Sequence, residues 1–313
     1  MLLQFAILFV AIVLLYFGAE FALESAEKIG LALGFSPLVI GLLIVGFGTS
    51  LPEFFVSQLA CYRGESEIAL GNVVGSNIAN LFLILGVSGI ISSLYITARE
   101  IKIQFYFHIA ITLLLSYFLL QPRITWSAAV AFGAFFGFYL YDTFRQMKRD
   151  RGEMGDLDNP RESHKIHLKD YGLLILGFVF LYFGGELLVS SGTKIALSIG
   201  ISSYVVSAVF VAFGTSFPEL VTAIMTAKKG KNTDIIVGNI IGSNIFNVAF
   251  VLGSVSFYNI DISSKFYTEI AVLIFAALFL PFMALIKRKF GTYSGILFLC
   301  IYGGIVFSWV KNN

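Results

Sequence analysis

Long apolar segments separated by short polar stretches follow one another along most of the chain. Their length and helical period match the roughly 30 Å hydrocarbon core of a bilayer and differ from the short alternating strands of an outer-membrane barrel. The pattern therefore predicts an all-α integral membrane protein with ten transmembrane helices. The expected spans are 3–31, 37–61, 68–92, 103–120, 124–144, 170–198, 203–227, 234–256, 267–286 and 292–310.

One clearly polar stretch divides these segments into two groups of five. Residues 145–169 are rich in Lys, Arg, Asp and Glu and include Gly152 and Pro160. This stretch is too short to form a folded domain, so we interpret it as a cytoplasmic linker. It joins a first five-helix unit, 1–144, to a second, 170–313.

The two units share sequence motifs. Gly-Thr-Ser-Leu-Pro-Glu at 48–53 returns as Gly-Thr-Ser-Phe-Pro-Glu at 214–219, an offset of 166 residues (219 − 53). Gly-Asn-x-x-Gly-Ser-Asn at 71–77 returns at 238–244, an offset of 167 (244 − 77). Because five is an odd number, the second unit must enter the membrane upside down relative to the first. Inverted repeats are typical of secondary transporters, whose substrate site lies near the membrane midplane.

The distribution of basic residues predicts the orientation. With the N-terminus outside, 16 of the 21 Lys and Arg residues fall in cytoplasmic loops, as the positive-inside rule requires. We therefore expect a multi-pass protein of the plasma (inner) membrane with both termini outside. The first apolar run has no preceding Lys or Arg and no small-residue cleavage site, so we expect a retained helix and not a signal peptide.

Composition agrees with the membrane assignment and excludes other classes. The chain is 58% hydrophobic and 13% charged, whereas soluble domains carry about 25% charged residues. A net charge of +2 gives no reason to expect a nucleic-acid partner, and the lipid bilayer is the only partner besides ions that we predict, with no protein partner. Cys61 and Cys300 lie far apart and suggest neither a disulfide framework nor a metal site.

Two prolines are expected to break helices at membrane depth. Pro52 has no N–H to offer the carbonyl of Gly48, and Pro218 stands in the same relation to Gly214. Carbonyl oxygens freed inside a membrane are tolerated only where they are buried in protein or line a cavity. A structural kink is the simpler interpretation of one proline, but the symmetric recurrence favours a functional break.

Each proline is followed by a carboxylate. An ionised Glu at the bilayer centre costs roughly 3 kcal/mol on insertion scales, so Glu53 and Glu219 are functional candidates. Hydroxyl residues three and four positions earlier share their helical face. They are Thr49, Ser50, Thr215 and Ser216. The next helix carries a polar stripe with a four-residue period, Asn72, Ser76 and Asn80 in the first half and Asn239, Ser243 and Asn247 in the second. For Asn72, Asn77, Asn239 and Asn244, interhelical hydrogen bonding is an equal alternative.

The candidate site contains carboxylate, hydroxyl, amide and carbonyl oxygens without thiolate or imidazole. Such a donor set suits Ca²⁺ or Na⁺ and not zinc or copper. Two carboxylates neutralise one Ca²⁺, and Na⁺ would compete for the same oxygens, as an exchanger requires. We expect no cofactor, with Na⁺ and Ca²⁺ as cargo. No nucleophile–base pair and no His-Glu-x-x-His motif is present, so the chain is not expected to be an enzyme.

Four further acids have open roles. Glu20 and Glu186 are deep and symmetric, and either line the access paths or form hydrogen bonds to a neighbouring helix. Glu67 and Asp234 precede the third and eighth segments, where a carboxylate favours a helix N-terminus; an ion vestibule is the alternative.

Taken together, the paired motifs resemble the α-repeats of sodium/calcium exchangers in the calcium/cation antiporter superfamily, here at about 37–92 and 203–256. The linker leaves no room for the calcium-sensing domains of animal exchangers, so the chain resembles a compact prokaryotic member. The resemblance implies a secondary active antiporter that exchanges Na⁺ for Ca²⁺ by alternating access. It also implies that helices two, three, seven and eight surround the ions while helices one and six slide across them.

The resemblance also implies a ligand set. It places backbone carbonyl ligands at Gly46 and Ala212, two residues before the positions that the prolines indicate, and we prefer the family positions. Potassium-dependent relatives carry Asp where this chain has Asn247, which implies potassium independence. The implied side-chain ligands are Thr49, Ser50, Glu53, Ser76, Asn80, Thr215, Ser216, Glu219, Ser243 and Asn247.

Two rival transport functions stay open at this point. A family stoichiometry of three Na⁺ per Ca²⁺ would make transport electrogenic, but two carboxylates do not by themselves fix that ratio. A cation/proton antiporter would use Glu53 and Glu219 as proton carriers. A cation channel would need no counter-ion.

Overall fold

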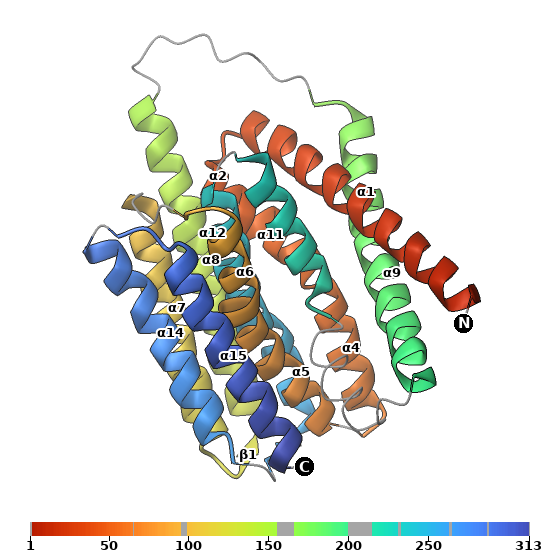
Figure 1. The fold of residues 1–313 in the computed structure, drawn as a ribbon. Helices are drawn as coiled ribbons and strands as arrows, with labels where there is room; N and C mark the ends of the chain where they lie inside the picture. The colour runs from red at the N-terminus through yellow and green to blue at the C-terminus, as the bar shows by residue number, and fades with distance from the viewer. Residues whose placement is uncertain are drawn as a thin grey trace.

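A computed structural model describes residues 2–64, 66–94, 99–154, 166–199, 215–230, 233–262, 265–286 and 288–312. Within these ranges the chain is helical apart from two short strands and one isolated β-bridge. Figure 1 shows a long helix pair, α1 and α9, set against one side of a larger group of helices. The expectation of an all-helical membrane protein is confirmed.

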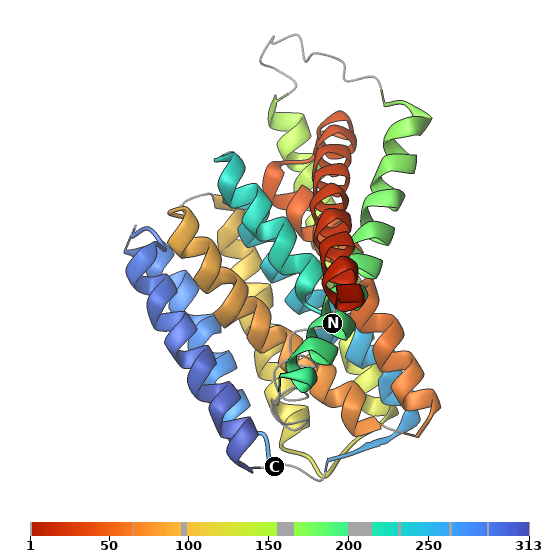
Figure 2. The same ribbon diagram turned by 45° about the vertical axis from the view of Figure 1, so that its right-hand side comes forward.

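Helix α1 (Leu2–Ala32) and helix α9 (Leu168–Ser198) pack against each other along much of their length. Small residues allow the two backbones to approach closely. A Cβ on Gly18 would lie 2.8 Å from the backbone N of Leu181, and a Cβ on Gly177 would lie 2.5 Å from that of Ala22. The turned view in Figure 2 shows the same two helices crossing beside the bundle. They therefore form one packed unit.

The second apolar segment forms a helix with two irregularities. It comprises α2 (Pro37–Val39), the π-helical turn η1 (Ile40–Val45), α3 (Gly46–Thr49) and α4 (Leu51–Tyr62). Ser36 caps the start, where its Oγ accepts the N–H of Val39 at 3.4 Å, and Pro37 occupies the first turn, which requires no intrahelical N–H bond. The corresponding segment of the second half is described only from residue 215 onward, as α11 (Phe217–Lys229).

The third segment of each half follows the same plan. The first half has α5 (Ser66–Ile78), a π-helical turn η2 (Ala79–Ile84) and α6 (Leu85–Ile91). The second half has α12 (Thr233–Phe246), a π-helical turn η3 (Asn247–Leu252), α13 (Gly253–Val255) and the 3₁₀ turn η4 (Ser256–Tyr258). Every residue from Ile235 to Phe246 is buried, so α12 lies at the centre of the described structure.

Four helices flank this central group. They are α7 (Arg99–Leu119), α8 (Trp126–Met154), α14 (Tyr267–Leu285) and α15 (Thr292–Asn312). Helix α14 packs on α7, α15 packs on α6, and α8 packs on η3. Helix α8 continues to Met154, so the first part of the stretch expected to be a polar linker is helical.

Two small β pairings join loops at the ends of the helices. Strand β1 (Arg123–Ile124) pairs antiparallel with β2 (Ile260–Asp261), and Leu94 forms an isolated bridge with Phe290. Leu94 and Asp261 are separated by 167 residues (261 − 94), and Arg123 and Phe290 by the same number (290 − 123). The two pairings therefore join equivalent positions of the two halves.

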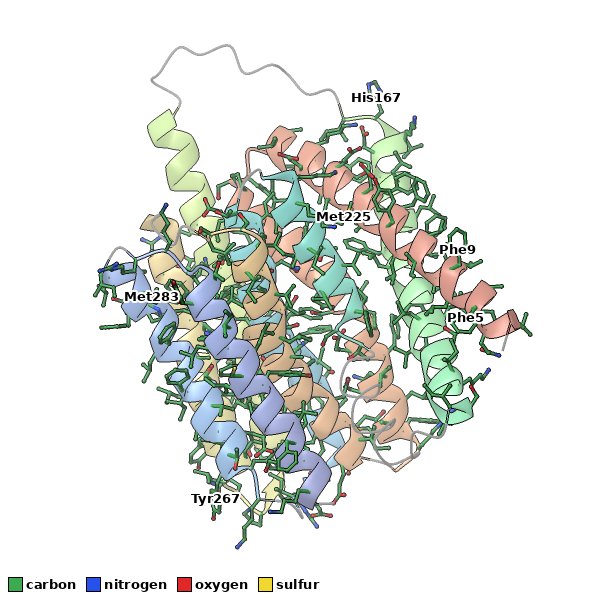
Figure 3. The ribbon with its side chains drawn as sticks, viewed as in Figure 1. Phe5, Phe9, His167, Met225, Tyr267 and Met283 are labelled. Atoms are coloured by element: carbon green, nitrogen blue, oxygen red, sulfur yellow. The ribbon has the colours of Figure 1, made fainter. Side chains whose placement is uncertain are left out.

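Seven described helices are long and apolar enough to cross a membrane, which supports a multi-pass integral membrane protein. Their outer surfaces carry large apolar side chains such as Phe5 and Phe9 on α1 and Tyr267 on α14 (Figure 3). The seven spans are Leu3–Ala32, Pro37–Tyr62, Ser66–Ile91, Leu168–Gly192, Thr233–Tyr258, Tyr267–Leu285 and Thr292–Trp309. Ile103–Leu119 is a shorter apolar helix, and 203–214 lies outside the described residues, so the count of ten stays a prediction.

Candidate ion-binding site

The helix break before each Pro-Glu pair has the same backbone geometry. In the first half, α3 ends at Thr49 and α4 begins at Leu51, with Ser50 between them at φ −89° and ψ 4°. In the second half, Ser216 precedes α11 at φ −86° and ψ 6°. This bridge region of backbone space is sparsely populated and is common at functional sites. The two halves thus interrupt the chain at equivalent residues.

A single carbonyl in the first break contacts the rest of the site. The Gly46 carbonyl accepts the Ser50 N–H at 3.2 Å and the Ser243 hydroxyl at 3.2 Å. Gly48, which the proline argument favoured, packs instead under α9, where a Cβ would lie 2.0 Å from the ring of Phe178. The Gly46 carbonyl therefore contacts the second half, whereas Gly48 packs against α9. The counterpart of Gly46, Ala212, lies outside the described residues, as does Gly214.

Three π-helical turns adjoin the candidate ligands. Gly46 directly follows η1, Asn80 lies in η2 and Asn247 begins η3. A π turn changes the backbone hydrogen-bond pattern locally and is frequent at functional sites. The two asparagines sit at the same place in their respective halves (247 − 80 = 167).

The breaks bring two buried carboxylates together. Glu53 lies in the first turn of α4 and Glu219 in the first turn of α11, and both are fully buried. A helix N-terminus favours negative charge, which compensates part of the cost of burial. The Ser50 hydroxyl of the first half donates to Glu219 Oε1 of the second half at 3.2 Å.

Each threonine of the motif contacts an asparagine of the other half, and the Thr49 hydroxyl also lies 3.0 Å from the Val45 carbonyl of its own helix. Thr49 Oγ1 lies 3.3 Å from Asn239 Oδ1, and Thr215 Oγ1 lies 3.0 Å from Asn72 Oδ1. The sequence left the roles of Asn72 and Asn239 open, and the structure uses both for interhelical hydrogen bonds. The single hydroxyl proton of Thr215 goes to Asn72, and both carboxylate oxygens of Glu53 are without a hydrogen-bond partner among the described residues.

The amides of Asn80 and Asn247 use their nitrogens, and not their oxygens, in hydrogen bonds. Asn80 Nδ2 donates to Asn244 Oδ1 at 3.1 Å, and Asn247 Nδ2 donates to Ser76 Oγ at 3.1 Å. Each amide nitrogen is thereby engaged away from the carboxylates. Each Oδ1 is left as a buried acceptor without a hydrogen-bond partner among the described residues.

Six buried oxygens of the site find no hydrogen-bond partner within the described part of the chain. A buried acceptor left unpaired costs about 1–3 kcal/mol, so a group of them requires a common partner. A desolvated cation is the partner that several acceptor oxygens can share. The six are both carboxylate oxygens of Glu53, Glu219 Oε2, Asn80 Oδ1, Asn247 Oδ1 and Ser216 Oγ.

The acids outside the motifs lie elsewhere. Glu67 and Asp234 occupy the first turns of α5 and α12, as a helix N-terminus favours. Glu20 on α1 pairs with Lys229, and Glu186 on α9 is exposed. In the described ranges no group of three or more His, Cys, Asp or Glu could hold a metal ion.

His108 belongs to none of the repeated motifs, yet it lies near the site in the structure. Its Nε2 lies 3.5 Å from Asn244 Nδ2, and Asn244 accepts from Asn80. Helix periodicity predicts which face of α7 is buried, but it does not predict which helix packs against that face. No motif in the sequence connects His108 with residue 244.

Comparisons with known proteins decide the family. The model of the sodium/calcium exchanger protein family matches residues 3–144 and 169–310. This chain belongs to the sodium/calcium exchanger family. An uncharacterised membrane protein of Methanocaldococcus jannaschii is 34% identical over 296 residues, covering 93% of each chain. The sodium/calcium exchanger MaX1 of Methanosarcina acetivorans is 30% identical over 343 residues, covering 96% of each.

The fold agrees with this sodium/calcium exchanger assignment. Structures of the sodium–calcium exchanger NCX_Mj superpose with a TM-score of 0.82 at 30% identity, covering 98% of this chain and 99% of the other. The two stretches matched by the family lie on either side of the polar segment, and candidate ligands come from both. The resemblance inferred from the repeated motifs is confirmed, including the prokaryotic type.

Proposed function

We propose that this exchanger moves Ca²⁺ against Na⁺ through one site shared by Glu53 and Glu219. The observation that carries the proposal is the group of six unpartnered buried oxygens described above. Those oxygens are hard, anionic or neutral ligands, which match Ca²⁺ and Na⁺. Membership of the sodium/calcium exchanger family supports the same pair of ions.

The proposed set contains residues that carry the unpartnered oxygens and residues that orient them. Gly46 offers its carbonyl, while Ser50 and Ser76 hold neighbouring groups through hydrogen bonds. Ala212 is included solely because it is the equivalent of Gly46 in the second half. The full proposed set is Gly46, Thr49, Ser50, Glu53, Ser76, Asn80, Ala212, Thr215, Ser216, Glu219, Ser243 and Asn247, with Pro52 and Pro218 as the helix-breaking residues.

We further infer ten transmembrane helices in two inverted five-helix repeats, 1–144 and 170–313. The equivalence of the Leu94–Phe290 and Asp261–Arg123 pairings supports an internal two-fold relation. So does the match of α1 to α9, whose first and last residues both differ by 166 (168 − 2 and 198 − 32). With the basic loops in the cytoplasm, both termini lie outside the plasma membrane.

The charge balance of the site suggests the ion requirements. Two carboxylates neutralise one Ca²⁺, and Asn247 contributes no charge where potassium-dependent relatives have Asp. We therefore propose potassium-independent exchange. At three Na⁺ per Ca²⁺, a tenfold Na⁺ gradient supplies about 1.4 kcal/mol per ion and 100 mV adds about 2.3 kcal/mol for the net charge. The sum, about 6.5 kcal/mol, would hold internal Ca²⁺ low by more than four orders of magnitude.

Flux into proteoliposomes tests the proposal. Vesicles loaded with Na⁺ and diluted into Na⁺-free buffer should take up ⁴⁵Ca²⁺, and an inside-positive membrane potential should speed this uptake. Equal uptake driven by a pH gradient without Na⁺ would instead identify a cation/proton antiporter. Uptake that follows voltage without any counter-ion gradient would identify a channel.

A further inference from the structure

The internal repeat pairs two acids and two bases at equivalent positions. Glu20 on α1 corresponds to Glu186 on α9 (186 − 20 = 166), and Arg63 after α4 corresponds to Lys229 at the end of α11 (229 − 63 = 166). Only one of the two possible ion pairs is formed. Lys229 Nζ lies 3.4 Å from Glu20 Oε1, whereas Arg63 and Glu186 are exposed and have no ion pair among the described residues.

The formed pair connects the two parts of the molecule. Glu20 belongs to the α1–α9 pair, and Lys229 belongs to the central group that carries Glu219. In Figure 1 the end of α11 that carries Lys229 lies in the upper part of the view, and the end of α4 that precedes Arg63 lies at the bottom. The two candidate ion pairs therefore belong to opposite ends of the bundle.

The other contacts in this region are either apolar or lie within the α1–α9 pair. Met225 on α11, one turn before Lys229, packs against apolar residues of α1 and α9 (Figure 3). The nearby Lys28–Asp170 pair, at 3.9 Å, joins α1 to α9 and lies within the pair of helices. The two salt bridges of Lys229 join α1 to α11 and so connect the α1–α9 pair to the central group.

An antiporter with one buried site must expose that site to each side in turn. In transporters built from inverted repeats, alternating access is largely a rigid-body movement of one part against the other around a fixed site. We infer that in this protein each half then adopts the arrangement that the other half had. An interaction between the halves is then replaced by its symmetry equivalent. Resting on the proposed exchange function, we propose that Glu20–Lys229 and Glu186–Arg63 are alternating ion pairs, each formed in one access state and broken in the other.

The described ion pair is suited to repeated breakage. The side chains of Lys229 and Glu20 are 39% and 27% exposed, and partly solvated ion pairs contribute little net stability. Such a pair shifts the balance between two states without locking either one. Lys229 also lies 3.7 Å from Glu24, whose equivalent in the second half is Ser190 (190 − 24 = 166). The additional carboxylate biases the protein toward the state in which Lys229 is paired.

Cysteine cross-linking tests the alternation directly. In full-length protein with Cys61→Ala and Cys300→Ser, the pairs Glu20→Cys/Lys229→Cys and Arg63→Cys/Glu186→Cys are oxidised in vesicles. We expect the first pair to cross-link readily and to stop exchange until a reductant is added. Adding Lys229→Gln to the second pair should raise its cross-linking yield at least threefold, because the opposing ion pair is lost.

Lys228→Gln is the matched control for that experiment. It removes the same charge from the same end of α11, but Lys228 is exposed and outside the described salt bridges, so the yield should not change. A cross-link between Arg63→Cys and Glu186→Cys that never forms, or that rises equally with both lysine variants, would overturn the proposal. Size-exclusion profiles of each variant show whether the protein is folded.

Charge exchange provides a second measurement. Lys229→Glu should slow exchange severalfold, and Glu20→Lys in the same chain should restore most of the lost rate; no restoration would count against the ion pair. Cross-linking is measured without a transport assay, so the alternating ion pairs and the exchange function are tested independently. Cross-links that alternate without Na⁺-driven Ca²⁺ flux would refute the exchange function, whereas flux without a Glu186–Arg63 contact would refute the alternation.

Discussion

The two halves carry the same motif but do not surround the site equally. Ser50 of the first half donates to Glu219, whereas the equivalent Ser216 of the second half has no hydrogen-bond partner among the described residues. Glu53 consequently keeps both carboxylate oxygens unpaired, and Glu219 keeps one. An internal repeat therefore supplies matching side chains, while packing decides which of their oxygens have hydrogen-bond partners.

The largest expected effect comes from removing either carboxylate. Glu53→Gln and Glu219→Gln should each reduce Na⁺-driven ⁴⁵Ca²⁺ uptake at least 100-fold, because a Ca²⁺ site with one charge leaves the ion uncompensated in a buried environment. Asp261→Asn, which removes an exposed carboxylate, should stay within twofold of the parent. Wild-type uptake in either Gln variant would remove that Glu from the site and break the equivalence of the halves.

Adding a carboxylate should have the next largest effect. Asn247→Asp places a third negative charge beside a Ca²⁺ that two carboxylates already neutralise, so exchange should fall about tenfold. External K⁺ should restore part of the rate, while it should leave the parent protein unaffected. The symmetric variant Asn80→Asp shows whether the two halves respond alike. Potassium stimulation of the parent itself would contradict the proposed potassium independence.

The threonines distinguish the halves at a smaller scale. Thr49→Val leaves the buried Asn239 oxygen with one donor fewer, and about 1–3 kcal/mol is expected for such a loss. The apparent KM for Ca²⁺ should rise about tenfold with little change in maximal rate. Thr215→Val should have a weaker effect because Thr215 is only partly buried, so more water reaches its position. A larger effect of Thr215→Val than of Thr49→Val would contradict this prediction.

The smallest effect on exchange is expected at the α1–α9 crossing. Gly177 corresponds to Ala11 in the first half (177 − 11 = 166), so Gly177→Ala makes the two helices alike at this position. The new Cβ would lie 2.5 Å from the Ala22 backbone N, and the overpacking should cost about 1–3 kcal/mol in a thermal-unfolding measurement. Gly172→Ala on the same helix meets no described atom within 4 Å and should unfold like the parent.

Several features of the two halves could be predicted from the sequence. The repeat offset, the two Pro-Glu pairs and the stripe from Asn72 to Asn80 were all legible because they are local patterns with a fixed period. The family followed from those patterns. The preference for Gly46 over Gly48 came from the resemblance, since the missing proline N–H by itself indicated Gly48.

The hydrogen-bond partners that join the two halves could not be predicted from the sequence. Helical period tells which side chains share a face, but it does not tell which distant helix that face meets. The Thr49–Asn239 and Thr215–Asn72 bonds join residues in different halves, as does the contact of His108 with Asn244. The π-helical turns at Asn80 and Asn247 depend on backbone packing that no residue type announces.

The sequence by itself determined the membrane class, the repeated motif and the residues that carry charge, because burial in lipid restricts polar groups so strongly that each exception is visible. Tertiary structure decided which oxygens are left without hydrogen-bond partners and which of two equivalent ion pairs is formed. Those outcomes depend on small differences in packing between two similar halves. A repeated sequence specifies both arrangements, and only the folded state selects one of them.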